Sequence, residues 1–429
     1  MIKRVFSTIA VASFAIASFA GGLLTNTNQS AAFVRNPARY ASLEADAVYF
    51  NPAGTAFLQE GWNVSANWQM IWQSRDVQST KFMGQPNDKE YKGKVYVPCM
   101  PTFLATYKTG DWAFSAFFGM PGGGGNAQFD NGLPVFDALG YGKTNCPSSS
   151  AFESTQYLFS LQLGAAYKIN ENLSAYAGLR TNYTSLSYEG NINFNHPAYG
   201  NTELLGLELT QTGVAFAPIV GVDYKAGNFN LGVKYEFRAV NTIENDTKTL
   251  NAQGNNVIGM VAQALPDLAT LEDGVKFRND APAKLSVGAS YDICDRVKVM
   301  GAGVYYFDKD ATIESLLTKE NTMEKLDRNT FELLAGVEVK VTDKLLLSSG
   351  IQFSDFGVNE HYLTDISFID DSFMVGFGGK YSFNENWDLN FGACYANYAH
   401  GKGVNVDTYS ESTYLRKTFN AAVGVDFRF

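Results

Sequence analysis

The sequence has little charge and no long apolar run after its first twenty residues. Charged residues make up 18% of the 429, against about 25% in ordinary soluble proteins. The net charge of −10 argues against a nucleic-acid-binding surface. Because no later run of about eighteen apolar residues occurs, no transmembrane helix is expected in the rest of the chain. If this chain lies in a membrane, it must cross as β-strands, since only helices and closed barrels satisfy their backbone groups in lipid.

Residue patterns for catalysis and metal binding are scarce. The three histidines, His196, His361 and His400, lie in or beside segments that read as long loops, without the spacing of metal ligands. A hydrolase or acyltransferase at the outer rim would use Ser367 or Ser410, but nothing in the sequence joins either serine to a histidine. No Gly-Lys-Ser/Thr follows the glycine run near residue 122, which excludes a phosphate loop. We predict no enzyme activity, no metal and no cofactor.

Cysteine is also rare. The four cysteines, Cys99, Cys146, Cys294 and Cys394, are far apart and form no Cys-x-x-Cys pair for zinc or redox chemistry. An exported protein would meet an oxidising compartment, where a disulfide can form. Cys99 with Cys146 is the pairing that we would choose, and the alternative is four isolated thiols.

The first twenty residues have the three parts of a secretory signal peptide. Lys3 and Arg4 form a positive start, residues 5–17 are apolar, and residues 18–20 offer small side chains for cleavage. A membrane anchor is the alternative, but the apolar run is short and rich in Ala and Ser. We predict a signal peptide over residues 1–20.

From residue 61 onward the hydrophobic period is two. In residues 228–240, apolar and aromatic side chains alternate with Asn230, Gly232, Lys234, Glu236 and Arg238. Residues 329–341 and 419–429 repeat this alternation. Strict alternation predicts strands with one apolar and one polar face. A soluble sandwich would give the same pattern, so the alternation alone does not decide.

The connections between the strands decide it. We count about fourteen strand-like runs, and tight turns alternate with long segments between them. Short periplasmic turns and long outer loops are typical of an outer-membrane barrel. An aromatic content of 14% and 40 glycines also fit aromatic girdles and tight turns. We predict an all-β fold, a transmembrane antiparallel β-barrel of about 14 strands over residues 61–429. The runs are 62–77, 95–107, 111–119, 153–167, 173–188, 210–224, 228–242, 281–293, 296–307, 327–341, 344–356, 371–383, 387–398 and 413–429.

Residues 33–58 fit neither a strand nor a helix. They contain two Asn-Pro-Ala steps, at residues 36–38 and 51–53. Proline at a first helical position after asparagine predicts a short capped turn, which Gly54 can end. A compact, partly apolar segment of this kind needs walls that satisfy its backbone, although Asn-Pro is also a common sign of a surface loop.

Residues 46–54, Asp-Ala-Val-Tyr-Phe-Asn-Pro-Ala-Gly, resemble the N-terminal hatch of the FadL/TodX family of outer-membrane transporters for fatty acids and other hydrophobic compounds. In that family such a step sits in a plug inside a barrel of fourteen strands. The resemblance implies a hatch over residues 21–60 inside the lumen. It also implies gating by Asp46, Asn51, Pro52, Ala53 and Gly54. The earlier step at residues 36–38 has no counterpart in the family pattern.

A glycine-rich stretch, Met-Pro-Gly-Gly-Gly-Gly at residues 120–125, follows the third predicted strand. Glycines near a strand end mark a bulge or kink. In the FadL-like family a kink in the third strand opens a lateral gap in the wall. Phe118 and Gly119 are therefore the candidates for such a gap. The alternative is the flexible root of an ordinary loop.

Ligand contacts are a weaker expectation. Leu23, Leu24 and Phe33 could fill the pocket when it is empty, and Lys234 or Arg238 could meet a carboxylate head group. The alternative for these inner-face charges is a network that holds the hatch. Residues 256–271 have roughly helical apolar spacing and could form a landing surface over the barrel mouth, or could pack only on their neighbours.

The function that the resemblance implies is passive transport of long-chain fatty acids or other hydrophobic molecules across the outer membrane, with lateral exit as one route. The alternatives are a hydrophilic porin, an outer-membrane acyl-chain enzyme and an adhesin. We expect a hydrophobic ligand, outer-membrane lipid and the barrel-assembly machinery as partners, no nucleic acid, and a monomer. The terminal Phe429 resembles the aromatic residue that this machinery reads.

Overall fold

The computed structural model describes residues 23, 26–138, 148–197, 200–251, 268–316, 318–405 and 409–429. The predicted signal peptide lies outside these residues, as do Leu24, Cys146 and most of the predicted landing segment. No helix in the described part of the chain has the length and apolar character to cross a membrane.

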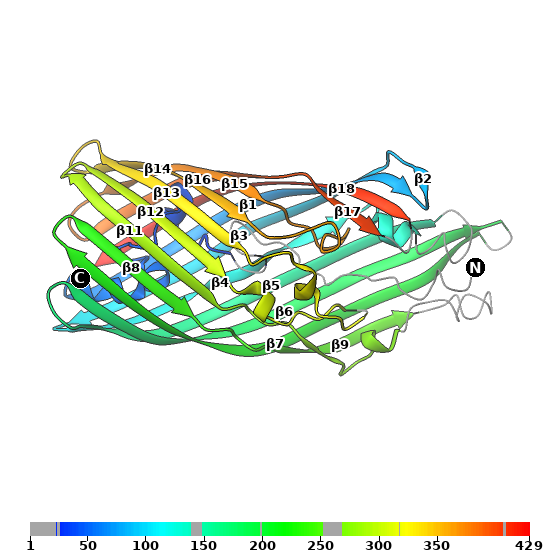
Figure 1. Cartoon of the computed structure of the whole chain (residues 1–429), viewed down its shortest axis with the longest axis horizontal. Coiled ribbons are helices and arrows are strands. Elements are labelled where there is room, and N and C mark those ends of the chain that lie inside the picture. The colour runs from blue at the N-terminus through cyan, green and yellow to red at the C-terminus, as the bar shows by residue number, and fades with distance from the viewer. Residues whose placement is uncertain are drawn as a thin grey trace.

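Fourteen antiparallel strands close into one barrel (Figure 1). Each strand pairs with the next along the ring, and β18 returns to β1 through a register that joins Asn63 to Arg428. The predicted fold class is confirmed. The ring consists of β1 (Gly61–Phe82), β3 (Glu90–Thr109), β4 (Trp112–Phe129), β5 (Ser148–Lys168), β6 (Leu173–His196), β7 (Gly200–Ala226), β8 (Phe229–Glu236), β11 (Lys284–Cys294), β12 (Val297–Tyr306), β13 (Phe331–Lys340), β14 (Leu345–Asp355), β15 (Ser372–Ser382), β16 (Trp387–Tyr398) and β18 (Ser410–Arg428).

Four short strands extend the wall at one end of the barrel. Within the described residues, β2 (Gln85–Pro86) and β17 (Gly401–Asn405) lengthen the hairpins of β1 and β18, and β9 (Thr242–Asn251) pairs with the far part of β7. β10 (Lys276–Arg278) pairs with β9. We call this end the loop end. The opposite end, which holds the C-terminus and the tight turns, is the turn end (Figure 1).

Several segments predicted as long loops are strands. β4 runs to Phe129, β6 to His196, and β7 begins at Gly200, so only residues 197–199 separate the two longest strands. Above the lipid both faces of a strand meet water or other loops, so the alternation that marks a membrane strand fades there. The prediction was wrong about these outer extensions for that reason.

The two faces of the wall differ as the alternation predicts. On β8, Asn230 and Lys234 are buried inside the barrel, and the intervening apolar residues are only half-buried on the outside. Near the turn end the outer face carries a ring of exposed aromatic side chains, as expected where a barrel meets the membrane interface. They are Trp62, Trp112, Tyr167, Tyr224, Trp387 and Phe429.

Arg238 departs from the predicted pattern. β8 ends at Glu236, and the Arg238 side chain is exposed. Its Nη1 donates to the carbonyl of Asp310, and its Nε lies 4.0 Å from Asp280 Oδ2. The predicted strand over residues 228–242 is therefore two segments. The expected inner-face position of Arg238 is wrong, because the chain leaves the β7 ladder after Glu236 and rejoins it as β9.

The predicted disulfide is also not supported. Cys99 is an exposed free cysteine, and its expected partner, Cys146, lies outside the described residues. Cys394 is buried in the wall, where a free cysteine packs as a small apolar side chain.

Candidate functional site: the hatch and a gap in the wall

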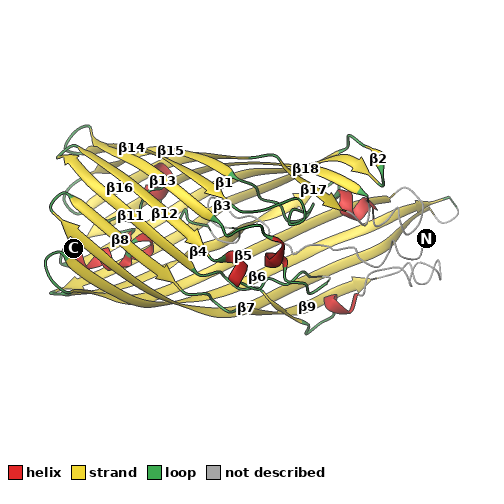
Figure 2. Ribbon diagram, viewed as in Figure 1, coloured by secondary structure: helices red, strands yellow, loops and turns green. Residues whose placement is uncertain are grey.

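The N-terminal segment lies inside the barrel, in the half nearest the turn end (Figure 2). It forms two short helices, α1 (Ala31–Arg35) and α2 (Ala47–Phe50), and the 3-10 helix η2 (Pro52–Phe57). Ser30 caps α1 by accepting a hydrogen bond from the backbone N–H of Phe33 at 2.9 Å. We call residues 26–60 the hatch. Nearly all of its residues are buried by the surrounding wall.

The second Asn-Pro-Ala step joins the hatch to the wall. Pro52 opens η2 as predicted, but the Asn51 side chain does not cap it. The Asn51 amide donates instead to the carbonyl of Ser42 at 3.1 Å and to Asp223 Oδ1 on β7 at 2.5 Å. The carbonyl of Ala53 accepts from Ser174 Oγ on β6 at 2.8 Å.

Gly54 does not end the helical turn, because η2 continues to Phe57. Its role is steric. A Cβ on Gly54 would lie 2.8 Å from the Leu43 side chain, closer than real Cβ atoms approach. On β8, a Cβ on Gly232 would lie 2.7 Å from Asn51 Oδ1. Gly54 therefore lets the hatch pack closely on itself, and Gly232 lets the hatch approach the wall at this step.

The first Asn-Pro-Ala step, which the family pattern left unassigned, makes an equivalent contact. The Oδ1 atom of Asn36 accepts from the backbone N–H of Ala38 at 3.2 Å. A Cβ on Gly336 of β13 would collide with the Asn36 side chain, and one on Gly350 of β14 would lie 2.7 Å from Pro37 Cδ. The two steps thus face two separate parts of the ring, β13–β14 and β7–β8.

Asp46 is the centre of the hatch's own hydrogen bonds. It accepts from Arg39 Nε at 2.8 Å and from Ser42 Oγ at 2.6 Å, and Ser30 Oγ lies 3.2 Å from its Oδ2. These bonds tie the caps and connections of α1 and α2 together. The Asp46 carboxylate is only 4% exposed, so the paired guanidinium compensates its desolvation.

A cluster of buried ions connects α1 to the wall. Glu338 on β13 lies 2.7 Å from Arg35 Nη1 and 3.2 Å from Arg39 Nη1. Glu44 bridges Arg39 and Lys380 of β15. Glu338, on the lumen face of β13, thus belongs to the hatch network. Arg35 and Arg39 were not predicted as site residues, although two arginines in so apolar a segment indicate buried ion pairs.

Lys234 holds the hatch rather than lying free in the lumen. Its ammonium donates to the carbonyl of Tyr49 at 2.6 Å and lies 2.7 Å from Glu236. Arg180 and Lys284 also pair with Glu236, at 2.6 and 3.3 Å. Three buried cations therefore surround one carboxylate next to α2. Arg180 and Lys284 could not be joined to this group from the sequence, because they lie on other strands.

The apolar residues expected in the pocket have different positions. Phe33 is fully buried and stacks on Phe50 with ring centroids 5.3 Å apart, inside the hatch itself. Tyr49 continues this aromatic group to Phe117 on β4, at 4.8 Å. Leu23 is 4% exposed. A ligand-binding role for Leu23 or Phe33 stays a prediction.

β3 and β4 separate in the middle of the wall. Their ladder joins Phe103 to Phe118 and resumes only at Val95 with Ala127. Residues 96–102 and 119–126 between these pairs do not pair with each other. On its other side β4 shifts register against β5 at residues 119–125, where Gly123 has a φ of 66°. Pro121 has no backbone N–H to donate, and it lies in the part of β4 that does not pair with β3. The glycine run is therefore a kink within a strand, and Phe118 is the last residue before it that pairs with β3.

The start of the hatch fills this separation from inside. The backbone N–H of Asn26 donates to the carbonyl of Pro121 at 2.7 Å, and its side-chain amide donates to Gly123. Gln29 Nε2 donates to the carbonyl of Met120 at 3.0 Å. Carbonyls of β4 that β3 does not bond are thus satisfied by residues 26–29, as buried carbonyl groups require. A Cβ on Gly119 would lie 2.8 Å from Gln29 Oε1.

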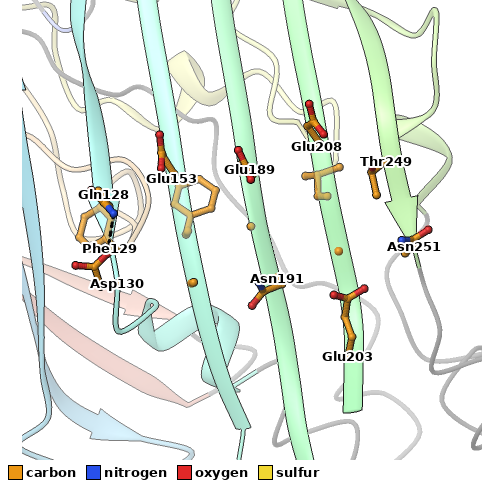
Figure 3. A pocket seen from close by; sticks show the side chains of 15 residues that line it. Gln128, Phe129, Asp130, Glu153, Glu189, Asn191, Glu203, Glu208, Thr249 and Asn251 are labelled. Carbon is orange, nitrogen blue, oxygen red and sulfur yellow. Dashed lines mark hydrogen bonds between the residues drawn. The ribbon is translucent and has the colours of Figure 1, made fainter. Parts of the chain in front are cut away.

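A polar hollow of about 290 Å³ lies on the wall near the loop end (Figure 3). Its carboxylates include Glu153, Glu189, Glu203 and Glu208, from three neighbouring strands. Glu208 pairs with Lys248 at 3.2 Å. The acids form no metal-binding group within the described residues. So acidic a surface does not suit an apolar solute.

Two of the three histidines have described side chains, and both lie on the surface. His361 and His400 are exposed near the loop end, and His361 Nε2 lies 3.9 Å from Glu360. These are positions of ordinary surface histidines.

Comparison with known proteins identifies the family. The family model described as "Outer membrane protein transport protein (OMPP1/FadL/TodX)" matches residues 9–426, nearly the whole chain. The chain belongs to the OMPP1/FadL/TodX family. It is thus an outer-membrane β-barrel of a family of transport proteins. A sequence search among curated proteins finds no match.

Solved structures share the fold at low identity. A FadL homologue of Pseudomonas aeruginosa has a TM-score of 0.71 at 17% identity, covering 95% of this chain and 100% of that one. The toluene transporters TodX of P. putida and TbuX of Ralstonia pickettii both have a TM-score of 0.56, at 14% and 15% identity. Each covers 90% of this chain and 94% of its own. At such identities the likeness shows the fold of the OMPP1/FadL/TodX family and nothing about the ligand.

Proposed function

We propose that this protein carries hydrophobic molecules, with long-chain fatty acids as the leading class, across the outer membrane by passive diffusion. The observation that carries the proposal is the separation of β3 and β4, filled from inside by residues 26–29. A wall that opens beside a movable segment gives an apolar solute a way into the membrane. Such an exit spares the solute from crossing water, which costs free energy in proportion to its apolar area.

The interior on the loop side of the hatch supports an apolar cargo. Buried aromatic side chains gather there, on strand faces that turn inward and on the segment between β14 and β15. A solute that enters among them would exchange water for apolar contacts. They are Tyr91, Phe129, Phe152, Tyr188, Phe368 and Tyr414.

In this proposal, Asp46, Asn51, Pro52, Ala53 and Gly54 control the gate. Asp46 holds the hatch together, and Asn51 and Ala53 hold it to β6 and β7. A small movement at residues 51–53 would release residues 26–29 from β4 and open the path past Phe118 and Gly119. Outer-membrane lipid would receive the solute. We further propose that the protein acts as a monomer and that the barrel-assembly machinery reads Phe429, whose side chain is exposed.

Uptake by cells tests the proposal. Cells with the native protein, with an Asn51→Ala/Pro52→Ala variant, or with none would be given a labelled long-chain fatty acid and, separately, labelled toluene. Uptake that requires the protein and falls in the variant at equal surface level supports a hatch-gated route. Equal fatty-acid uptake in all three cell types would overturn the fatty-acid version, and toluene would then test the neutral-hydrocarbon version. Ion conductance of the native protein would reveal a hydrophilic porin instead.

A further inference from the structure

Two buried arginines face each other inside the barrel. Arg75 of β1 and Arg416 of β18 are direct partners across the antiparallel pair. Both side chains point into the lumen, and the residues are 1% and 3% exposed. Like charges in directly opposite positions destabilise a sheet. A pair of this kind, buried from water, calls for a compensating anion.

No carboxylate in the described part of the chain compensates this pair. The ion pairs of the described residues include neither Arg75 nor Arg416, in contrast to Arg35, Arg39 and Arg180. Asp365, which lies within the segment that covers the pair, accepts instead from the backbone N–H of Val135 and from Tyr414 Oη, both at 2.9 Å.

The hydrogen bonds of the pair leave several donors unused. Arg75 Nη2 donates to the carbonyl of Phe368 at 3.1 Å, and Arg416 Nε donates to Gln73 Oε1 at 3.1 Å. Four buried polar atoms have no hydrogen-bond partner among the described residues: Arg75 Nη1, Arg416 Nη2, Gln73 Nε2 and Tyr398 Oη. Grouped around two positive charges, these four potential hydrogen-bond donors form a binding site for one anionic group.

The surroundings of the pair suit the rest of an amphiphile. The Arg75 guanidinium lies 4.4 Å above the Phe368 ring, and that of Arg416 lies 4.3 Å above Tyr398. Phe368 stacks on Tyr414 with ring centroids 4.7 Å apart. Leu363, Ile366 and Ile369 of the same covering segment are buried beside them. A charged subsite next to apolar side chains matches a molecule with one anionic head and an apolar tail.

We propose that Arg75 and Arg416 together bind the anionic head group of an amphiphilic solute, with a carboxylate as the head group that their forked donors fit best. The carboxylate takes the place of the Phe368 carbonyl on Arg75 and bonds the free nitrogens of both guanidinium groups. Paired hydrogen bonds between arginine and a carboxylate are short and strong. A lysine pair would not offer the same planar fork.

The position of the subsite fits the proposed route, on which this inference rests. Along the inner face of β1, Asn67 and Gln69 contact the hatch at Ala31 and Asn28. Arg75 lies six residues farther toward the loop end, about 20 Å along the strand. β1 is also the neighbour of β3, the strand that borders the gap. A head group held at Arg75 would leave its tail free to reach residues 26–29 and the gap.

The experiment compares two ligands that differ only in the head group. Native protein in lipid nanodiscs would be titrated with dodecanoate and with dodecanol, at a pH where the carboxylate is ionised, and binding to empty nanodiscs would be subtracted. The double variant Arg75→Gln/Arg416→Gln removes both charges. Arg296→Gln/Lys298→Gln removes two charges near a tight turn and is the matched control. A heat-dependent shift in gel mobility checks that each barrel is folded.

The native protein and the control should bind dodecanoate about tenfold more tightly than dodecanol, the effect of a charge-assisted hydrogen bond. In the double variant this preference should disappear while dodecanol affinity stays unchanged. A merely structural pair would weaken both ligands alike. If the variant does not fold, Arg75→Lys/Arg416→Lys keeps the charges and should retain a reduced preference. Equal affinity of the native protein for both ligands overturns the head-group site but leaves hydrophobic transport standing. Binding of neither ligand overturns both proposals.

Discussion

The side-chain amide of Asn51 donates to the carboxylate of Asp223, with Nδ2 2.5 Å from Oδ1. This bond joins the hatch directly to β7. Asn230 of β8 donates to the same oxygen at 2.9 Å and also reaches the carbonyl of Ala41. One wall carboxylate thus fixes the hatch through two amides.

Replacing Asn51 with alanine should loosen the hatch. The change removes the bonds to Asp223 and Ser42 and leaves a buried carboxylate with one donor fewer. The lost bond to a charged group corresponds to about 2 kcal/mol, so the hatch should open more often. Single-channel recordings in planar bilayers should show more frequent conducting events than in the native protein. Asn172→Ala, at an exposed turn, is the control, and equal event frequencies in all three proteins would contradict this role for Asn51.

Glu338 should matter more to the hatch than to the barrel. It is the wall carboxylate that faces both Arg35 and Arg39. Glu338→Gln would leave the buried Arg35 guanidinium without its close carboxylate, at a cost of about 3 kcal/mol, whereas Arg39 would keep Asp46 and Glu44. Amide hydrogen exchange should quicken in α1 and stay unchanged in the neighbouring strands. Glu385→Gln, in an exposed turn, should change neither. Faster exchange across β13 and β14 as well would mean that Glu338 supports the wall instead.

The stability of the loop around Asp308 should depend on pH. Burial raises the pKa of this carboxyl from 3.8 to about 6. Between these values the folded loop keeps a proton that the unfolded loop has released, so the loop loses stability as pH rises through this range. Hydrogen exchange at Thr330, whose N–H donates to Asp308 at 3.0 Å, should be slower at the acid end after correction for intrinsic rates. Asp308→Asn should remove this pH dependence of exchange at Thr330, and Asp310→Asn should keep it. An unchanged slope in Asp308→Asn would contradict the assignment.

The sequence predicts the membrane part of this fold well because lipid imposes a strict rule there. A strand such as β13 must face lipid with Leu333 and the lumen with Glu332, and this alternation is visible in the residues. Beyond the membrane the rule ends, and the continuation of β4, β6 and β7 was not predicted. The course of β8 was misread at Arg238, because a departure from a ladder leaves no mark in the alternation.

The site was predictable only where it is local in sequence. The Asn-Pro-Ala step and the glycine run each lie within a few residues, so their position in a hatch and in a kink could be expected. The partners across the barrel could not. Asn51 meets Asp223, and Arg75 meets Arg416, because ring closure brings distant strands together. The separation of β3 from β4 also depends on register, which a single strand does not reveal.

If solute leaves through the gap between β3 and β4, a large side chain at Gly119 should block its exit. Gly119→Trp would put a large group against Gln29 and the edge of the gap. Gly301→Trp adds the same side chain on β12, where the nearest atom to a new Cβ is 3.8 Å away. At equal surface level, fatty-acid uptake should fall close to that of cells without the protein in Gly119→Trp and remain native in Gly301→Trp. Native uptake in Gly119→Trp would contradict lateral exit.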